Sequence, residues 1–389
     1  MEARAIAILG ATGSIGTTTL KVVRAHPSLL RITGLAAHSR WRELVGPVKE
    51  FNVGTIALAD PVAAAEARAS GAFPAGTRIL EGTAGLTEVA CLPEVSMVVS
   101  AVVGTAGLAP TLAALKAKKD VALASKELLV LAGKFVTAAA RQSGARLLPV
   151  DSEHNAIHQL LRDKPAADIT RLVLTASGGA FRDTPLAELK NVSLAQALKH
   201  PNWDMGPKVT IDSATMANKG LEVIEARWLF DLPTDRIDVV IHPQSIIHSM
   251  VMLADGSLQA LLSPPSMAYP IQDCLLFPRR LPCPAPRLDL AQTLALTMSP
   301  PDPARYPCLG LARAAATTGG TAPAIFNAAN EVAVAAFVKG QLAFTGIAEL
   351  VGQTLAGCAA REPSSLEDVL SADAEARTAA SRLALALDR

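Results

Sequence analysis

The chain has 389 residues, of which 50% are hydrophobic, 4% are aromatic and 18% are charged, and its formal net charge is +1. This length suits roughly two to three domains, while the hydrophobic content excludes a disordered chain and the balanced charge excludes a dedicated nucleic-acid binder. The five cysteines form no Cys-x-x-Cys pair, which argues against a disulfide framework or a zinc cluster and favours a reducing compartment such as the cytoplasm.

Short apolar runs alternate with helical patterns in the first part of the chain. The predicted strands are Ala5–Leu9, Ile32–Ala36, Thr55–Leu58, Met97–Ala101, Val121–Leu123 and Leu147–Val150. Helices are predicted between them, for example over Thr17–Ala25 and Pro110–Ala117. Such alternation is typical of a parallel sheet with helices on both faces, so we predict an α/β fold that opens with a Rossmann-type sheet. The uncharged stretch Val95–Leu115 is interrupted by glycine and proline, so we do not expect a membrane span there.

After residue 150 the chain contains further predicted strands, then a proline-rich stretch, and then a region of helical patterns. Strands are predicted over Arg171–Thr175 and within Ile237–Leu262, and the proline-rich stretch Pro264–Pro307 is predicted to be a linker with one short helical insert. Helical patterns follow over Leu309–Ala316, Ala324–Val338, Ile347–Leu355 and Leu366–Leu387. We therefore expect a dinucleotide-binding domain in residues 1–149, a second α/β catalytic domain in residues 150–280 with a mobile loop near residues 198–208, a linker in residues 281–307 and a C-terminal α-helical domain in residues 308–389.

A glycine-rich turn follows the first predicted strand and opens the first helix. Its glycines, Gly10, Gly13 and Gly16, permit a tight turn and a close approach to a pyrophosphate, which the free N–H groups of the helix would bind. The second strand is followed by His38 and Ser39 rather than by the acidic residue that usually binds the ribose of NADH. A carboxylate would repel a 2′-phosphate, whereas His38, Ser39 and Arg40 would favour one, so we predict NADPH as the cofactor. The alternative for the glycine motif is a purely structural turn, and the alternative for the residues after the second strand is a solvated loop end.

Two carboxylates, Asp151 and Glu153, follow the last strand of this first region. On an extended segment residues i and i+2 point the same way, and adjacent carboxylates repel each other unless a cation or a proton lies between them. Together with Glu222 they would form a set of oxygen ligands suited to Mg²⁺ or Mn²⁺. A solvated acidic loop is the alternative.

Two histidines in the same region, His154 and His158, lie four residues apart. This spacing places both on one face of a helix, as in zinc-binding helices. Those helices carry a glutamate directly after the first histidine, whereas this chain has Asn155. We therefore expect a structural or supporting role for both histidines.

Several short hydrogen-bond donors occur near predicted turns and helix starts. Ser177–Gly179, Ser213 and Asn218–Gly220 could together bind an anion, with Lys219 as the positive charge. Trp203 lies in a polar, proline-flanked loop and is predicted to belong to a lid. Ser125–Glu127 follow a predicted strand and would lie at the sheet edge where ligands bind.

These motifs follow one another along the chain in the order found in one enzyme family. The chain resembles the 1-deoxy-D-xylulose 5-phosphate reductoisomerase family. The segments that carry the resemblance are Gly10–Gly16, Asp151–Glu153, Ala176–Gly179, His200–Trp203, Asp212–Glu222 and Asn327–Glu331. They are spread over most of the chain.

The resemblance implies a role for each matching residue. The implied cofactor-binding residues are Thr12, Gly13, Ser14, Ile15, Ala37, His38, Ser39, Ser125, Glu127 and Gly206. The implied metal ligands are Asp151, Glu153 and Glu222. The implied substrate-binding residues are Lys126, Ser152, Glu153, Ser177, His200, Trp203, Ser213, Asn218, Lys219 and Glu222, of which Lys126, Glu153 and His200 are also implied to be catalytic.

The resemblance also implies an activity, cofactors and partners. It implies a bacterial cytoplasmic homodimer that rearranges a phosphorylated ketose and reduces it with NADPH, using Mg²⁺ or Mn²⁺, with Co²⁺ as an alternative, and binding neither nucleic acid nor membrane. A different NADPH oxidoreductase, such as a sugar or amino-semialdehyde dehydrogenase, is one rival and would not need the metal. A non-catalytic dinucleotide sensor is another, and it would bind NADPH without oxidising it.

Overall fold

The computed structural model describes residues 3–203 and 205–387, so Asp204, in the predicted mobile loop, lies outside the described residues. The chain divides into two compact units, each with its own sheet and hydrophobic cluster. Unit 1 comprises Met1–Leu128, Lys134–His158 and Ser266–Pro286, and unit 2 comprises Leu129–Gly133, Gln159–Pro265 and Arg287–Arg389.

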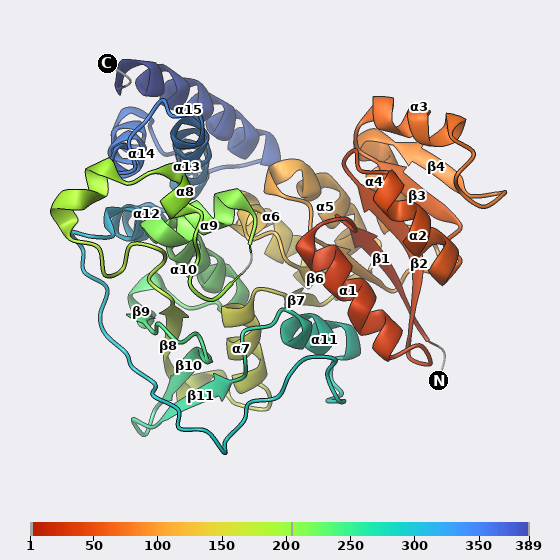
Figure 1. The fold of residues 1–389 in the computed structure, drawn as a ribbon, viewed down its shortest axis with the longest axis horizontal. Helices are drawn as coiled ribbons and strands as arrows, with labels where there is room; N and C mark the ends of the chain where they lie inside the picture. The colour runs from red at the N-terminus through yellow and green to blue at the C-terminus, as the bar shows by residue number, and fades with distance from the viewer. Residues whose placement is uncertain (1–2, 204, 388–389) are drawn as a thin grey trace. The chain divides into compact units, whose positions relative to one another are not determined.

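Unit 1 contains a parallel sheet of seven strands in the order β4-β3-β2-β1-β5-β6-β7 (Figure 1). The strands are β1 (Arg4–Leu9), β2 (Leu30–Ala37), β3 (Thr55–Leu58), β4 (Arg78–Glu81), β5 (Met97–Ser100), β6 (Asp120–Leu123) and β7 (Leu147–Pro149). The connecting helices are α1 (Ser14–Ala25), α2 (Arg42–Phe51), α3 (Pro61–Ala69), α4 (Gly82–Ala90), η1 (Gly104–Gly107), α5 (Leu108–Lys116) and α6 (Glu127–Ser143). The strand order reverses between β1 and β5, and open α/β sheets bind ligands at the carboxyl ends of strands at such a point.

The predicted parallel sheet is confirmed. The expected strand over Thr55–Leu58 has the bounds of β3, and the other expected strands differ from the observed ones by one or two residues at an end. The edge strand β4 is not predicted by the sequence, because only Ile79 and Leu80 lie between a charged residue at each end. Pairing with β3 therefore makes this segment a strand, with little help from its own hydrophobicity.

The helical insert expected in the proline-rich stretch is confirmed as α11 (Ala268–Leu276), and it packs against α1 within unit 1. His26 Nε2 lies 2.8 Å from Gln272 Oε1. The Arg4 guanidinium donates to the carbonyl oxygens of Leu275 and Phe277 at 2.8 and 3.2 Å. These contacts lie within one compact unit, which contains Ser266–Pro286 together with the N-terminal sheet. The predicted domain boundaries stay a prediction.

Unit 2 contains a mixed sheet of four strands in the order β11-β10-β8-β9 and a group of helices (Figure 1). The strands are β8 (Ile169–Ala176), β9 (Ile237–Ile241), β10 (Ile247–Leu253) and β11 (Leu258–Leu262). The helices are α8 (Leu194–Ala197), α9 (Pro207–Thr215), α10 (Ala217–Phe230), α12 (Pro307–Thr318), α13 (Ala322–Val338), α14 (Gly346–Gly357) and α15 (Leu366–Leu387), with the 3₁₀ turns η2 (Ala166–Asp168), η3 (Leu186–Asn191) and η4 (Thr234–Arg236). Helix α7 (Ser152–Leu160) begins in unit 1 and ends in unit 2.

The predicted C-terminal helices are confirmed, and they share one hydrophobic cluster with α9 and α10. Phe326 of α13 is fully buried in this cluster, together with apolar residues of α10, α12 and α14. The segment that carries the expected anion-binding residues is therefore packed on the helical part of unit 2. Its position depends on the hydrophobic packing there.

We expect Phe326→Ala to lower the free energy of unfolding by about 3–5 kcal/mol, because it removes a fully buried ring and leaves a cavity. Urea unfolding followed by circular dichroism measures this change. Leu290→Ala is the matched control, since Leu290 is 78% exposed and should change stability by less than about 0.5 kcal/mol. Equal effects of the two substitutions would contradict the assignment of Phe326 to the core.

Candidate active site

The turn after β1 is packed too closely for a side chain at two of its glycines. Gly10 has a φ of +91°, and a Cβ on it would lie 2.3 Å from the carbonyl oxygen of Ala101. A Cβ on Gly16, in the first turn of α1, would lie 2.4 Å from the carbonyl oxygen of Gly10. Gly13 is the N-cap of α1 and has no side chain with which to cap it. The first N–H groups of α1 are therefore available to an anionic ligand.

The end of β2 lies beside this turn. Ala37, the last residue of β2, is buried, while His38 and Ser39 after it are exposed. The Arg40 guanidinium donates to the carbonyl oxygen of Thr12 at 2.7 Å, which joins the end of β2 to the turn. The structure thus brings the residues predicted to bind the pyrophosphate, 12–15, to the same sheet edge as those predicted to bind the 2′-phosphate, 37–39.

Three buried residues follow β6 at the same edge of the sheet. Ser125, Lys126 and Glu127 are 5%, 8% and 7% exposed. Ser125 donates a hydrogen bond to the carbonyl oxygen of Val102, and Lys126 Nζ lies 2.5 Å from Asp151 Oδ2. This ion pair links the carboxyl ends of β6 and β7 and offsets the cost of burying the ammonium group.

The acidic segment after β7 is helical rather than extended. Helix α7 begins at Ser152, directly after Asp151, whose carbonyl oxygen accepts a hydrogen bond from Asn155 N–H at 2.8 Å. The prediction that Asp151 and Glu153 lie on one side of an extended segment is therefore wrong, because the chain turns into a helix as soon as β7 ends. Within this turn Ser152 Oγ donates to Glu153 Oε2 at 2.5 Å.

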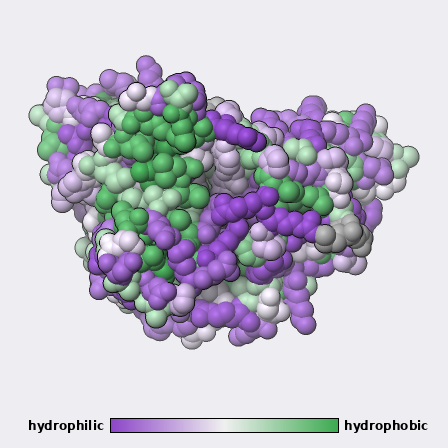
Figure 2. Space-filling model, turned by 90° about the horizontal axis from the view of Figure 1, so that it is seen from below, coloured by the Kyte–Doolittle hydropathy of each residue, from purple (hydrophilic) through white to green (hydrophobic). Residues whose placement is uncertain are grey.

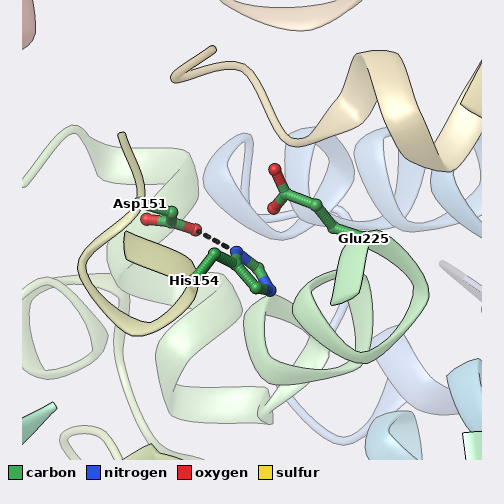
Figure 3. Close-up of side chains that lie close together, drawn as sticks. All are labelled: Asp151, His154 and Glu225. Atoms are coloured by element: carbon green, nitrogen blue, oxygen red, sulfur yellow. Dashed lines mark ion pairs between the residues drawn. The ribbon is translucent and has the colours of Figure 1, made fainter. Parts of the chain in front are cut away.

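The two histidines of α7 have different acidic partners. Nδ1 of the fully buried His154 lies 3.9 Å from Asp151 Oδ2 (Figure 3). Nδ1 of His158 lies 3.8 Å from Asp273 Oδ2, and its ring packs against Phe277 with centroids 5.3 Å apart. The two histidines therefore have separate carboxylate partners, and the supporting roles expected for them stay a prediction.

In unit 2, β8 ends in a glycine loop that lies against α9. Gly178 and Gly179 have φ values of +84° and +69°, and a Cβ on Gly179 would lie 2.5 Å from Ala214 Cα. Ser177 Oγ accepts a hydrogen bond from Gly179 N–H at 3.1 Å and lies 2.9 Å from His200 Nε2. The structure therefore brings Ser177, His200 and the end of α9 together, although they are distant in sequence.

The loop around His200 is held by its own histidine. Nδ1 of His200 accepts hydrogen bonds from the N–H groups of Asn202 and Trp203 at 3.2 and 3.0 Å. The Asn202 side chain donates to the turn after β9, and the Trp203 ring lies 6.3 Å from that of His248. Gly206, predicted to lie near the cofactor, is the exposed N-cap of α9.

Helices α9 and α10 meet at Met216, which has a φ of +61°. Ser213 lies in the last turn of α9, while Asn218 and Lys219 lie in the first turn of α10. Asn218 Nδ2 donates to Glu222 Oε1 at 2.6 Å, and Lys219 Nζ forms an ion pair with Glu222 Oε2. Glu222 is only 1% exposed, so these two donors offset the desolvation of its carboxylate.

A buried carboxylate for which the sequence predicts no individual role anchors α9. Asp212 is 1% exposed, and its two oxygens lie 2.9 Å from Lys208 Nζ and 2.9 Å from Asn330 Nδ2. Asn330 belongs to the segment Asn327–Glu331, which contributes to the resemblance, but no property of the sequence indicates its partner. The sequence likewise gives no sign that Tyr306, one of only two tyrosines, donates its hydroxyl to the Gly178 carbonyl oxygen, or that Arg182 donates to the Ser177 carbonyl oxygen.

Three family models match successive parts of the chain. Residues 6–133 match "1-deoxy-D-xylulose 5-phosphate reductoisomerase", residues 147–230 match the C-terminal domain of that enzyme, and residues 262–379 match "DXP reductoisomerase C-terminal domain". Curated relatives of this name include one from Chlorobium phaeobacteroides, 50% identical over 98% of this chain and 99% of its own length. Another, from Dechloromonas aromatica, is 50% identical over 97% of this chain and 96% of its own.

Solved structures agree with these matches. The 1-deoxy-D-xylulose 5-phosphate reductoisomerase from Zymomonas mobilis, in complex with NADPH, is 41% identical with a TM-score of 0.92, covering 98% of this chain and 99% of its own. A DOX-P reductoisomerase in complex with NADPH, fosmidomycin and magnesium is also 41% identical with a TM-score of 0.92, covering 99% of both chains.

The fold and these matches define the chain as an NADP-dependent oxidoreductase. More narrowly, it belongs to the 1-deoxy-D-xylulose 5-phosphate reductoisomerase family. Among the described residues, no helix is both long enough and apolar enough to cross a membrane.

We expect Gly16→Ala to lower the affinity for NADPH about tenfold or more, because a Cβ at this position would push α1 away from the carbonyl oxygens of the turn. Titration of the protein with NADPH, followed by the fluorescence of the nicotinamide, measures the affinity. Gly54→Ala is the matched control, since Gly54 is exposed and has open space around its Cβ position. Equal affinities of the two variants would contradict the role of the turn.

Proposed function

We propose that the chain converts 1-deoxy-D-xylulose 5-phosphate to 2-C-methyl-D-erythritol 4-phosphate, a step of the non-mevalonate route to isoprenoid precursors, with NADPH and a divalent metal. The observation that carries the proposal is family membership over nearly the whole chain. Relatives whose structures hold NADPH and magnesium support both cofactors. An all-oxygen set of donors, Asp151, Glu153 and Glu222, suits Mg²⁺ or Mn²⁺ better than a soft metal.

The turn after β1 suits the pyrophosphate of NADPH. The free N–H groups at the start of α1 would bind its oxygens, and Thr12, Gly13, Ser14 and Ile15 would surround it. The exposed 2′-phosphate would be met by residues 37–39, where the sequence provides a hydroxyl and an imidazole instead of a carboxylate. Ser125, Glu127 and Gly206 would lie near the nicotinamide half, from which a hydride is transferred to the rearranged aldehyde.

We assign the divalent metal to Asp151, Glu153 and Glu222. A bound divalent cation would polarise the ketose carbonyl as a Lewis acid. Lys126 already neutralises Asp151, and it would also stabilise negative charge that develops on the reacting oxygens. Ser152, next to both carboxylates, would orient the same end of the substrate.

We assign the substrate phosphate to unit 2. Ser177, Ser213, Asn218 and Lys219 provide hydroxyl, amide and ammonium donors on neighbouring loops and helix ends. His200 would bind the substrate beside them and is proposed to be catalytic together with Lys126 and Glu153. The loop that carries Trp203 would close on the bound substrate and exclude water from the reacting carbons.

Adding 1-deoxy-D-xylulose 5-phosphate and Mg²⁺ to the protein and NADPH should cause loss of NADPH absorbance. The loss should stop when the metal is chelated, because the rearrangement that precedes reduction needs it. A different NADPH oxidoreductase would remain active without metal, and a dinucleotide sensor would leave the absorbance unchanged.

Glu222→Gln should lower metal affinity and turnover about tenfold or more while NADPH binding is retained. Glu349→Gln, at an exposed carboxylate of α14, is the control; unchanged turnover of Glu222→Gln at saturating Mg²⁺ would remove Glu222 from the metal site.

We also propose that the protein is a cytoplasmic homodimer that pairs through the β8–β11 sheet. One face of this sheet is apolar, with Val173 and Met250 buried and Leu258 and Leu262 of the edge strand β11 48% and 41% exposed. Figure 2 shows a broad apolar area on the side of the molecule on which β10 and β11 lie in Figure 1. An exposed apolar area of this kind marks a contact surface more often than free surface.

Sedimentation should therefore give twice the mass of the chain, and Leu262→Asp should shift the protein toward the monomer, because it puts a charge on the apolar face. Val62→Asp is the matched control, since Val62 is 68% exposed on α3 of unit 1. A wild-type monomer would contradict the dimer, and a Leu262→Asp dimer as stable as the wild type would contradict its surface.

A further inference from the structure

Tyr306 lies directly before α12, at the end of the stretch predicted to be a linker, yet it is only 3% exposed. Its hydroxyl donates a hydrogen bond to the carbonyl oxygen of Gly178 at 2.9 Å. Burial raises the pKa of Tyr306 to about 12, so the hydroxyl keeps its proton at any pH at which the protein works. It therefore remains a donor to this carbonyl.

The carbonyl of Gly178 and the N–H of Gly179 belong to one planar trans peptide and point in opposite directions. A donor that holds the carbonyl therefore also fixes the direction of the N–H. The Gly179 N–H donates to Ser177 Oγ at 3.1 Å. Both glycines have positive φ, and because glycine has no Cβ its backbone can rotate over a wide range of φ and ψ. The peptide between them therefore needs an external partner to keep its orientation.

The second donor to Ser177 Oγ follows from the environment of His200. Nδ1 of His200 accepts hydrogen bonds from the N–H groups of Asn202 and Trp203, so in the neutral ring the proton is on Nε2. Nε2 lies 2.9 Å from Ser177 Oγ and therefore donates to it. Ser177 Oγ then accepts two hydrogen bonds, and its own hydrogen is left to be donated to a third group.

We propose that Tyr306 is a positioning residue for substrate binding, which acts through the Gly178–Gly179 peptide to direct the Ser177 hydroxyl hydrogen at a phosphoryl oxygen of the substrate. This inference rests on the proposed function, in which Ser177 binds the phosphate. Arg182 supports the same loop, since its Nη1 donates to the Ser177 carbonyl oxygen at 3.0 Å. The Tyr306 hydroxyl is bonded to the Gly178 carbonyl oxygen, so in this proposal it acts on the substrate only through the loop.

The test is Tyr306→Phe, which removes one hydroxyl and keeps the buried ring. KM for 1-deoxy-D-xylulose 5-phosphate, and its dissociation constant measured by calorimetry, should rise about threefold to tenfold, the usual effect of one lost neutral hydrogen bond. The kcat should change by less than about twofold, because the lost interaction serves binding in the ground state and transition state alike. The affinity for NADPH should not change.

A second substitution distinguishes positioning from general damage to the fold. In a Ser177→Ala background, Tyr306→Phe should have no further effect on KM, because the hydroxyl through which it acts is gone. Tyr269→Phe is the matched control: Tyr269 also donates its hydroxyl to a carbonyl oxygen, that of Pro286, but in unit 1, and this variant should keep the wild-type KM. Arg182→Gln, which alters a partly exposed side chain, should raise KM in the same direction even if Tyr306→Phe folds poorly.

An unchanged KM in both Tyr306→Phe and Arg182→Gln would overturn the inference, as would an effect of Tyr306→Phe that persists in full without the Ser177 hydroxyl. The proposed activity fails in a different way. Wild-type protein that binds 1-deoxy-D-xylulose 5-phosphate without oxidising NADPH would overturn the activity, while the ratio of dissociation constants would still decide the role of Tyr306. Wild-type protein that does not bind this compound would overturn both.

Discussion

Burying a charged group without a partner costs several kcal/mol, and both units are built around this constraint. In unit 1, Lys126 lies 2.5 Å from Asp151; in unit 2, Lys219 is paired with Glu222, and Lys208 with Asp212. Each of these carboxylates is thus neutralised before any ligand is bound. A cation bound by Asp151 or Glu222 would compete with the lysine, and the released ammonium group would be available to the anionic substrate.

The same constraint explains why Asp212 has a second partner. Its carboxylate is nearly inaccessible to water. Lys208 lies closest to Oδ2, and Asn330 of α13 donates a hydrogen bond to Oδ1. The helical part of unit 2 therefore does more than add hydrophobic contacts. It stabilises the charge that holds the first turn of α9, which leads from the Trp203 loop to the expected phosphate-binding residues.

The loops that we propose to bind ligands in the two units share one feature: a stretch of backbone approaches another more closely than a side chain would allow. In unit 1 this occurs between Gly16 and Gly10, and in unit 2 between Gly179 and Ala214. In both cases a strand ends, the chain turns with positive φ, and main-chain groups face a helix end. The orientation of the peptides in these turns then depends on outside partners, as Tyr306 illustrates for Gly178.

Much of the fold follows from the sequence alone, because hydrophobic periodicity and the positions of glycine and proline act locally. They determine the strands β1 to β3 and β5 to β7, the C-terminal helices and the glycine turn after β1. Residue types likewise indicate which side chains can bind a phosphate or a hard cation. Only the tertiary structure decides that α7 starts at Ser152, that α11 packs on α1, and that Asn330 meets Asp212 and Tyr306 meets Gly178. The contacts of α11 with α1, of Asn330 with Asp212 and of Tyr306 with Gly178 join residues more than a hundred positions apart. Such pairings depend on how whole elements pack, which local sequence patterns do not encode.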